Sequence, residues 1–275
     1  ADTASRPMSK ANSTRSNNQA GRTSDGELEE EQGAALLMEA SSSLRTTTEV
    51  AGTAAPEAPA GTAASRVEIA PEYGVIMIKG ALTVAEQKRV MKTIKLPKAK
   101  GPVPASFVVS HGDPGTDGRI EFFHTMGERF FTIAAEQIRA AVPEEQMKAE
   151  PAFNHLLRHL TGEAPVKVHH VAGMGYTMAT KLTNHTDCPK SLFTMSVAIG
   201  HTCDFVLGQK TPRPHAKERN GPPVTIQMES GDAMFFDAGC IPHAIARIVP
   251  KTAPAHWNEE FARVSMLFRE PDWLR

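Results

Sequence analysis

The second half of the chain carries a series of short apolar segments separated by turns. Each segment is between four and nine residues long, which suits a buried β-strand and is too short for most helices. Gly231 and Asp232 stand between two of the segments and predict a tight turn. The predicted strands are Ser191–Ile199, Val224–Met228, Ala233–Phe236 and Arg263–Arg269.

Helical spacing of apolar residues appears earlier in the chain. Thr83 is a plausible N-cap for a helix that continues to Ile94. Phe122–Ala141 and Glu145–Leu160 are each predicted as one helix, and Gly74–Lys79 and Ser106–Ser110 as further strands. Many short strands preceded by helices predict a mainly β domain with flanking helices, an α+β fold, and favour a double-stranded β-helix (jelly-roll) core.

A His-x-Asp pair, His185 and Asp187, comes directly before the strand predicted at Ser191–Ile199. With His243 downstream, it supplies two imidazoles and one carboxylate. This is the ligand set of the facial triad that holds non-haem Fe(II) and leaves coordination positions open. The spacing alone is weak, because it arises by chance in a chain with 11 histidines. The alternative is a polar loop with an exposed aspartate.

The last predicted strand places two arginines, Arg263 and Arg269, six residues apart in an otherwise apolar segment. Because side chains alternate along a strand, both point to the same face. Buried guanidinium groups need anionic partners. A dicarboxylate cosubstrate would be such a partner.

Taken together, these motifs resemble the AlkB group of Fe(II)/2-oxoglutarate-dependent dioxygenases, over about Arg66 to Arg269. The family pattern has Asn-x-Tyr, then His-x-Asp nine residues after the Tyr, a distal His, and Arg-x-Asn followed by a second Arg. Tyr176 stands nine residues before His185, and Val67–Gln87 is similar to the opening strand and helix of the family. The resemblance implies a jelly-roll fold in which the metal lies between two sheets.

The resemblance also implies roles for individual residues. His185, Asp187 and His243 would bind Fe(II). Tyr176, Arg263, Arg269 and Ser265 would bind the cosubstrate 2-oxoglutarate, and O2 would be the oxidant. The implied reaction is hydroxylation and demethylation of an alkylated DNA or RNA base, and some branches of the family act on protein side chains.

Two positions depart from the family pattern. Met174 replaces the Asn before the Tyr, and Ser265 replaces the Asn between the two arginines. A thioether is only a weak hydrogen-bond acceptor, so Met174 cannot replace an amide that binds a carboxylate. An alternative is therefore a catalytically silent domain that serves as a binding or assembly module in a ribonucleoprotein complex.

The segment from Gly208 to Pro223 is predicted as a long loop rich in basic residues. Phosphate groups of a nucleic-acid substrate would bind such side chains. The alternative is a flexible surface loop. The candidate phosphate contacts are Lys210, Arg213, Lys217 and Arg219.

Residues 1–65 differ from the rest of the chain, because they are rich in small and polar residues and contain no aromatic residue. They predict a largely disordered N-terminal extension, a candidate for binding a protein partner, ahead of a domain over residues 66–275. No apolar run approaches the length of a membrane span, so no membrane partner is expected. Three cysteines without a disulfide pattern predict a reducing intracellular compartment, and they do not distinguish nucleus, cytoplasm and mitochondrion.

Overall fold

The structure is a computed structural model that describes residues 66–98, 103–111, 115, 117–164, 167–187 and 193–269. The extension predicted for residues 1–65 lies outside these residues. In the described part of the chain, no helix is long and apolar enough to cross a membrane.

The larger of two antiparallel sheets has seven strands in the order β1-β2-β9-β6-β11-β4-β3. Strands distant in the sequence are neighbours in it, and β11 pairs with both β4 and β6. The crossovers between neighbours are those of a jelly roll. The strands are β1 (Arg66–Ala70), β2 (Val75–Lys79), β3 (Ala105–His111), β4 (His170–Tyr176), β6 (Phe193–Gly200), β9 (Ala233–Asp237) and β11 (Arg263–Arg269).

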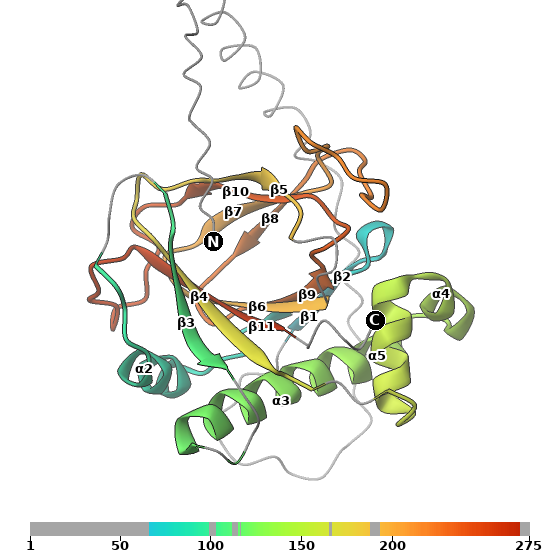
Figure 1. Cartoon of the computed structure of the whole chain (residues 1–275), viewed down its shortest axis with the longest axis horizontal. Helices are drawn as coiled ribbons and strands as arrows, with labels where there is room; N and C mark the ends of the chain where they lie inside the picture. The colour runs from blue at the N-terminus through green and yellow to red at the C-terminus, as the bar shows by residue number, and fades with distance from the viewer. Residues whose placement is uncertain are drawn as a thin grey trace, which may run out of the picture. The chain divides into compact units, whose positions relative to one another are not determined.

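The smaller sheet has four strands in the order β5-β10-β7-β8 and faces the larger one (Figure 1). The two sheets form a double-stranded β-helix, so the predicted α+β fold with a jelly-roll core is confirmed. Three strands of this sheet were not predicted from the sequence: β5 (Leu182–His185), β7 (Cys203–Leu207) and β10 (His243–Ile248). The fourth, β8 (Val224–Met228), has the predicted bounds.

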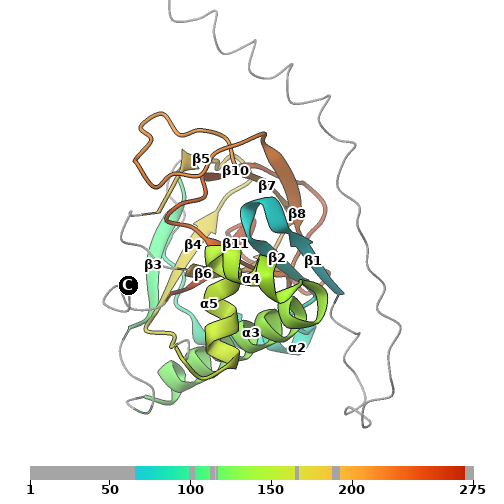
Figure 2. The same ribbon diagram turned by 90° about the vertical axis from the view of Figure 1, so that its right-hand side faces the viewer.

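The helices cover the outer face of the larger sheet (Figure 2). The predicted helix over Glu145–Leu160 is wrong in one respect, because it is two helices that meet at Glu150. Pro151 disfavours a helical conformation of the residue before it, and the backbone of Glu150 is extended. The helices are α2 (Val84–Thr93), α3 (Gly118–Ala141), α4 (Glu144–Ala149) and α5 (Pro151–Leu160), and the 3-10 helix η1 spans Pro71–Tyr73.

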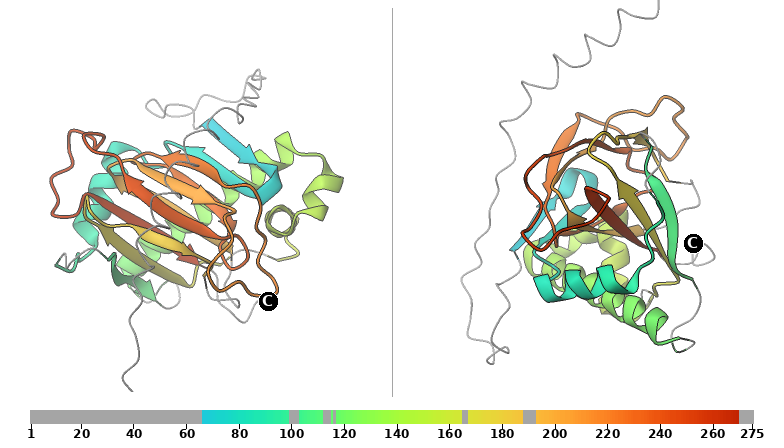
Figure 3. Two further views of the ribbon diagram at one scale, coloured as in Figure 1. Left: turned by 90° about the horizontal axis from the view of Figure 1, so that it is seen from above. Right: turned by 90° about the vertical axis from the view of Figure 1, so that its left-hand side faces the viewer.

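Alternation along the strands divides the interior into two apolar layers. Figure 3 shows the sheets and helices from two further sides. In β11, Val264, Met266 and Phe268 pack with the helices, in a core that includes Phe123 and Phe130 of α3. The residues between them in sequence point into the space between the sheets. There a second core contains Phe205 and Phe236 among others. The predicted metal ligands lie beside this second core.

Candidate metal centre

His185, Asp187 and His243 lie together between the two sheets. His185 ends β5, His243 begins β10, and the two residues are directly opposite each other in the antiparallel pair. Asp187 Oδ1 is 3.7 Å from His185 Nε2 and 3.9 Å from His243 Nε2. In the described residues, this is the one group of three or more His, Cys, Asp or Glu side chains whose ligand atoms all lie within 4.8 Å of one another.

Main-chain carbonyls fix the orientation of both imidazoles. His185 Nδ1 is 2.8 Å from the carbonyl oxygen of Thr183, and His243 Nδ1 is 3.0 Å from that of Ile241. Since a carbonyl only accepts, each Nδ1 carries a hydrogen, and Nε2 is the nitrogen of each ring that can bind a metal. This arrangement is the usual support of metal-binding histidines.

The more buried imidazole is held neutral. Burial first, and then the neighbouring ring of His185, lowers the pKa of His243 to about 4. The ring also packs against Phe205 and Phe236, with centroid distances of 5.8 and 5.0 Å. A neutral imidazole is the form that binds metals, so His243 is ready to coordinate one at neutral pH.

Arg269 holds the carboxylate ligand. Its guanidinium donates to Asp187 Oδ2 at 2.6 Å, while Asp187 Oδ1 faces the two imidazoles. The strand alternation that predicted a shared face for Arg263 and Arg269 therefore brings Arg269 to the predicted metal ligands. One carboxylate oxygen remains for the metal, as in the facial triad.

A cavity of about 30 Å³ adjoins the three predicted ligands. Its wall is largely apolar and includes Leu182, Ile245 and Leu267. Four hydroxyl-bearing side chains also line it: Tyr176, Thr194, Ser196 and Ser265. Thr194 and Ser196 were not predicted as site residues. They alternate with apolar residues on β6, and the segment was interpreted as one buried apolar strand.

Tyr176, Met174 and Ser265 meet at one end of the cavity. The Tyr176 hydroxyl is 3.6 Å from Met174 Sδ, and Ser265 lines the same cavity. Burial raises the pKa of Tyr176, so it stays a neutral hydrogen-bond donor. In the family pattern, both neighbours would be amides. Here the cavity offers a thioether and a hydroxyl instead.

Arg263 is fully buried on the same face of β11 as Ser265. Its guanidinium donates to the carbonyl oxygens of His201 at 3.0 Å and Met228 at 3.1 Å, and its Nε has no partner. Among the described residues, no carboxylate forms an ion pair with it. A buried cation without an anion is costly, and a ligand carboxylate would neutralise it.

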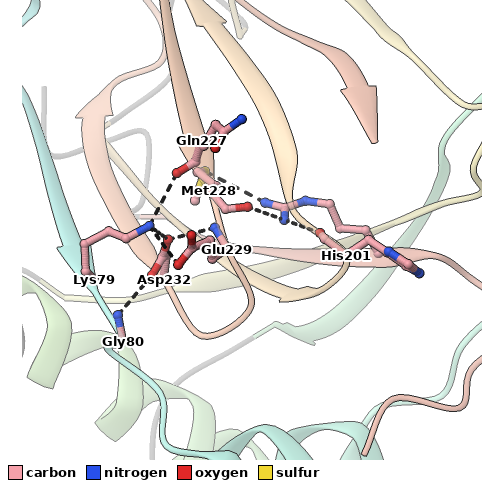
Figure 4. A network of polar contacts seen from close by, with 8 residues as sticks. Lys79, Gly80, His201, Gln227, Met228, Glu229 and Asp232 are labelled. Carbon is pink, nitrogen blue, oxygen red and sulfur yellow. Dashed lines mark hydrogen bonds and ion pairs between the residues drawn. The ribbon is translucent and has the colours of Figure 1, made fainter. Parts of the chain in front are cut away.

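The carbonyl partners of Arg263 belong to a polar network that fixes the turn between β8 and β9 (Figure 4). Asp232 accepts from the main-chain N–H groups of Gly80 and Glu229 and pairs with Lys79. Gly231 adopts a φ of 93°, which favours glycine. The turn predicted at Gly231 and Asp232 is therefore confirmed.

The predicted phosphate contacts divide into two groups. Lys210, Arg213 and Lys217 are exposed in the loop between β7 and β8. Arg219 instead forms two hydrogen bonds with the carboxylate of Glu150, at 2.7 and 2.8 Å. Its charge is already paired, and it anchors the base of the loop to the junction of α4 and α5.

The donor set fits Fe(II) and an anionic cosubstrate. Two imidazoles and one carboxylate oxygen face a common point, and the hydroxyl-lined cavity adjoins them. The unpartnered Nε of the buried Arg263 fits a carboxylate. Met174 and Ser265 are the two described residues of the cavity that fit a carboxylate less well than the amides of the family pattern.

No family model matches the sequence, and no curated protein matches it. Several solved structures are similar. OsALKBH1 has 21% identity and a TM-score of 0.49, over 74% of this chain and 100% of that one. An oxidoreductase of the 2OG-Fe(II) oxygenase family from Burkholderia pseudomallei has 11% identity and a TM-score of 0.39, over 72% and 84% of the two chains. The epimerase SnoN from nogalamycin biosynthesis has 15% identity and a TM-score of 0.39, over 73% and 80%.

The sheet topology decides the fold, which is a double-stranded β-helix (jelly roll) with the triad between its two sheets. At these identities and TM-scores, the matches say nothing about activity or substrate, which rest on the residues of the site.

Proposed function

We propose that this protein is an Fe(II)/2-oxoglutarate-dependent dioxygenase that hydroxylates, and so demethylates, an alkylated base in DNA or RNA. The observation that carries the proposal is the triad. The Nε2 atoms of His185 and His243 face the same oxygen of Asp187, and all three side chains are held by partners outside the site.

Each residue of the site has a defined task in this reaction. His185, Asp187 and His243 would hold the iron, and Arg269 keeps the Asp187 carboxylate turned toward it. Arg263 and the Tyr176 hydroxyl would bind the far carboxylate of 2-oxoglutarate. When bound, the iron and 2-oxoglutarate would together activate O2 to oxidise a C–H bond.

The substrate class is supported by the loop between β7 and β8, which contacts the segment that bears the predicted metal ligands (Figure 2). Asn184, next to His185, donates to the carbonyl oxygen of Lys210 at 3.0 Å. The exposed cations Lys210, Arg213 and Lys217 therefore belong to a loop held beside the cavity. Phosphates that flank a flipped-out base would bind there.

Activity is tested with single-stranded oligonucleotides that carry N-methylated bases. We expect formaldehyde release that requires Fe(II), 2-oxoglutarate and O2 and that is lost in His185→Ala. Oxygen-dependent turnover on a peptide library, with none on any oligonucleotide, would replace the nucleic-acid substrate with a protein side chain.

The loop is tested by reversing the charge of Lys210, Arg213 and Lys217 to Glu. We expect weaker oligonucleotide binding and a salt slope reduced by about two, since each phosphate contact on a single strand contributes about 0.7. A matched control reverses Lys88, Lys92 and Lys95, which are exposed on and after α2 in the helical layer. Equal losses in both triple variants would show that net charge, and not the loop, governs binding.

A silent binding module is the second candidate, and one observation favours it. Met174 and Ser265 leave this end of the cavity without the two amides of the family pattern. Such a module would bind oligonucleotides and would fail to bind 2-oxoglutarate. Binding of both ligands without turnover on any substrate would leave this candidate wrong and the substrate unidentified.

A further inference from the structure

Thr186 stands between the predicted ligands His185 and Asp187 and points the other way. In an extended segment, side chains alternate, so the ligands face the cavity while Thr186 faces outward. Its Oγ1 lies 3.2 Å from Nε2 of His215, which belongs to the loop between β7 and β8. No sequence motif connects these two residues, which are 29 positions apart.

The hydrogen-bond pattern fixes the direction of this contact. The main-chain N–H of Lys217 donates to His215 Nδ1 at 3.1 Å. Because that nitrogen accepts, the ring is neutral and its hydrogen is on Nε2. His215 therefore donates to the Thr186 hydroxyl, and its own ring is held by the turn of the loop.

The same loop is tied to both strands that bear the histidine ligands. Asn184, on β5, donates to the carbonyl oxygen of Lys210 at 3.0 Å. The N–H of Gly208 donates at 2.9 Å to the carbonyl oxygen of Pro242, the residue before His243. At a φ of 85° and packed on the Tyr73 ring, Gly208 cannot be replaced without moving the start of the loop.

We propose that His215 is a positioning residue of the metal centre, which acts on the His185–Asp187 segment through Thr186. β5 needs such a support. It has four residues and pairs with β10 at only two of them, His185 and Leu182. A side-chain bond from the loop restricts the segment on the face opposite the metal. The inference rests on the proposed function, because it assumes that the triad binds a metal.

The test uses Co(II) alone, whose visible spectrum reports the ligand geometry without turnover. His215→Leu removes the donor and keeps the bulk, whereas His215→Gln keeps an N–H donor. We expect His215→Leu to lower Co(II) affinity about tenfold, the lower end of the range for outer-shell partners, and to change the spectrum. His215→Gln should stay within about threefold of the wild type.

Variants of Thr186 provide a second test in the same Co(II) titration. Thr186→Val removes the acceptor with little change in shape, and Thr186→Ser keeps it. Thr186→Val should reproduce the loss seen in His215→Leu. The double variant should lose about tenfold and not the roughly hundredfold of two independent effects, because both changes break one bond.

Each outcome supports or overturns the positioning role of His215. Normal Co(II) affinity and spectrum in His215→Leu, or additive losses in the double variant, would overturn the positioning role and leave the proposed function intact. A lower melting temperature with an unchanged Co(II) spectrum would assign His215 to folding alone. Failure of the wild type to bind Co(II) would instead overturn the metal centre itself, and with it both proposals.

Discussion

Replacing Arg263 with Met should separate cosubstrate binding from stability. Arg263 is fully buried, with two bonds to carbonyl oxygens, an unpartnered Nε and no carboxylate partner in the described residues. In the unloaded protein, the substitution removes two hydrogen bonds from a charged group, worth about 1.5–3 kcal/mol each. It also removes a buried, unneutralised charge, whose burial costs several kcal/mol.

These opposing effects leave a net change within about 2 kcal/mol, or roughly 6 °C in melting temperature for a domain of this size. The loss of free energy of 2-oxoglutarate binding is larger than this change in stability. Breaking a buried charge pair costs about 3–5 kcal/mol, which weakens the Kd by a factor of about 10² to 4 × 10³. At a 2-oxoglutarate concentration 100 times the wild-type Kd, the ligand stabilises wild type by about 2.7 kcal/mol and Arg263→Met by about 0.4 kcal/mol or less.

Thermal unfolding of the Co(II)-loaded protein with and without 2-oxoglutarate measures both effects. We expect a rise of about 5–10 °C in the wild type and of less than about 2 °C in Arg263→Met. Arg263→Lys is the matched control, because it keeps the charge and loses the two-pronged geometry. A full 2-oxoglutarate-dependent rise in Arg263→Met would refute the role of this guanidinium as the carboxylate partner.

Two further predictions concern the cavity and the helical layer. Met174→Asn places an amide donor beside Tyr176 and should lower the 2-oxoglutarate Kd about three- to tenfold. Anaerobic calorimetry measures this Kd, and an unchanged value would show that Met174 does not limit binding. In the capping box of α2, burial alone would raise the pKa of Glu86, but hydrogen bonds from Arg129 and Thr83 hold it below its usual value. Because the folded-state pKa is lowered, Glu86 stabilises the protein at neutral pH, and this contribution is lost as the pH falls through that pKa. Glu86→Gln should therefore lower the free energy of unfolding by about 1 kcal/mol near pH 7 and by close to nothing well below the ordinary Glu pKa of about 4.3. Thermal unfolding at several pH values measures this difference. A loss of stability that did not depend on pH would contradict its ionic origin.

Local patterns predicted the elements whose burial is regular. β11 alternates along its whole length, so its bounds and the shared face of Arg263 and Arg269 followed from the sequence. The N-cap Thr83 of α2 was predicted from the sequence, and the structure adds the capping box with Glu86, three residues later. In both cases, the sequence pattern that predicts the feature lies within one segment.

One of the strands missed in the smaller sheet, β5, has no such local signal. β5 consists of Leu, Thr, Asn and His, of which Leu is the one apolar residue. It is a strand because β10 pairs with it, about sixty residues later in the chain. His243 comes after β9 and begins β10, which places it opposite His185.

The partners of the site residues were likewise beyond the sequence. The carbonyl groups that bind Arg263 come from His201 and Met228, 62 and 35 residues away. His215 was one basic residue in a predicted loop, and its bond to Thr186 exists because the loop folds back on β5. Spacing identifies ligands in a motif, but long-range packing selects the groups that hold them.

Anaerobic titration of metal-free protein with Fe(II), and then with 2-oxoglutarate, tests the central claim most directly. The readout is the weak visible charge-transfer band of an iron–2-oxoglutarate chelate, with His185→Ala as the control. We predict a band that appears only when both are present and is absent from His185→Ala. Iron binding without the band would mean that Met174 and Ser265 have abolished cosubstrate binding, and no iron binding at all would contradict the assignment of an oxygenase.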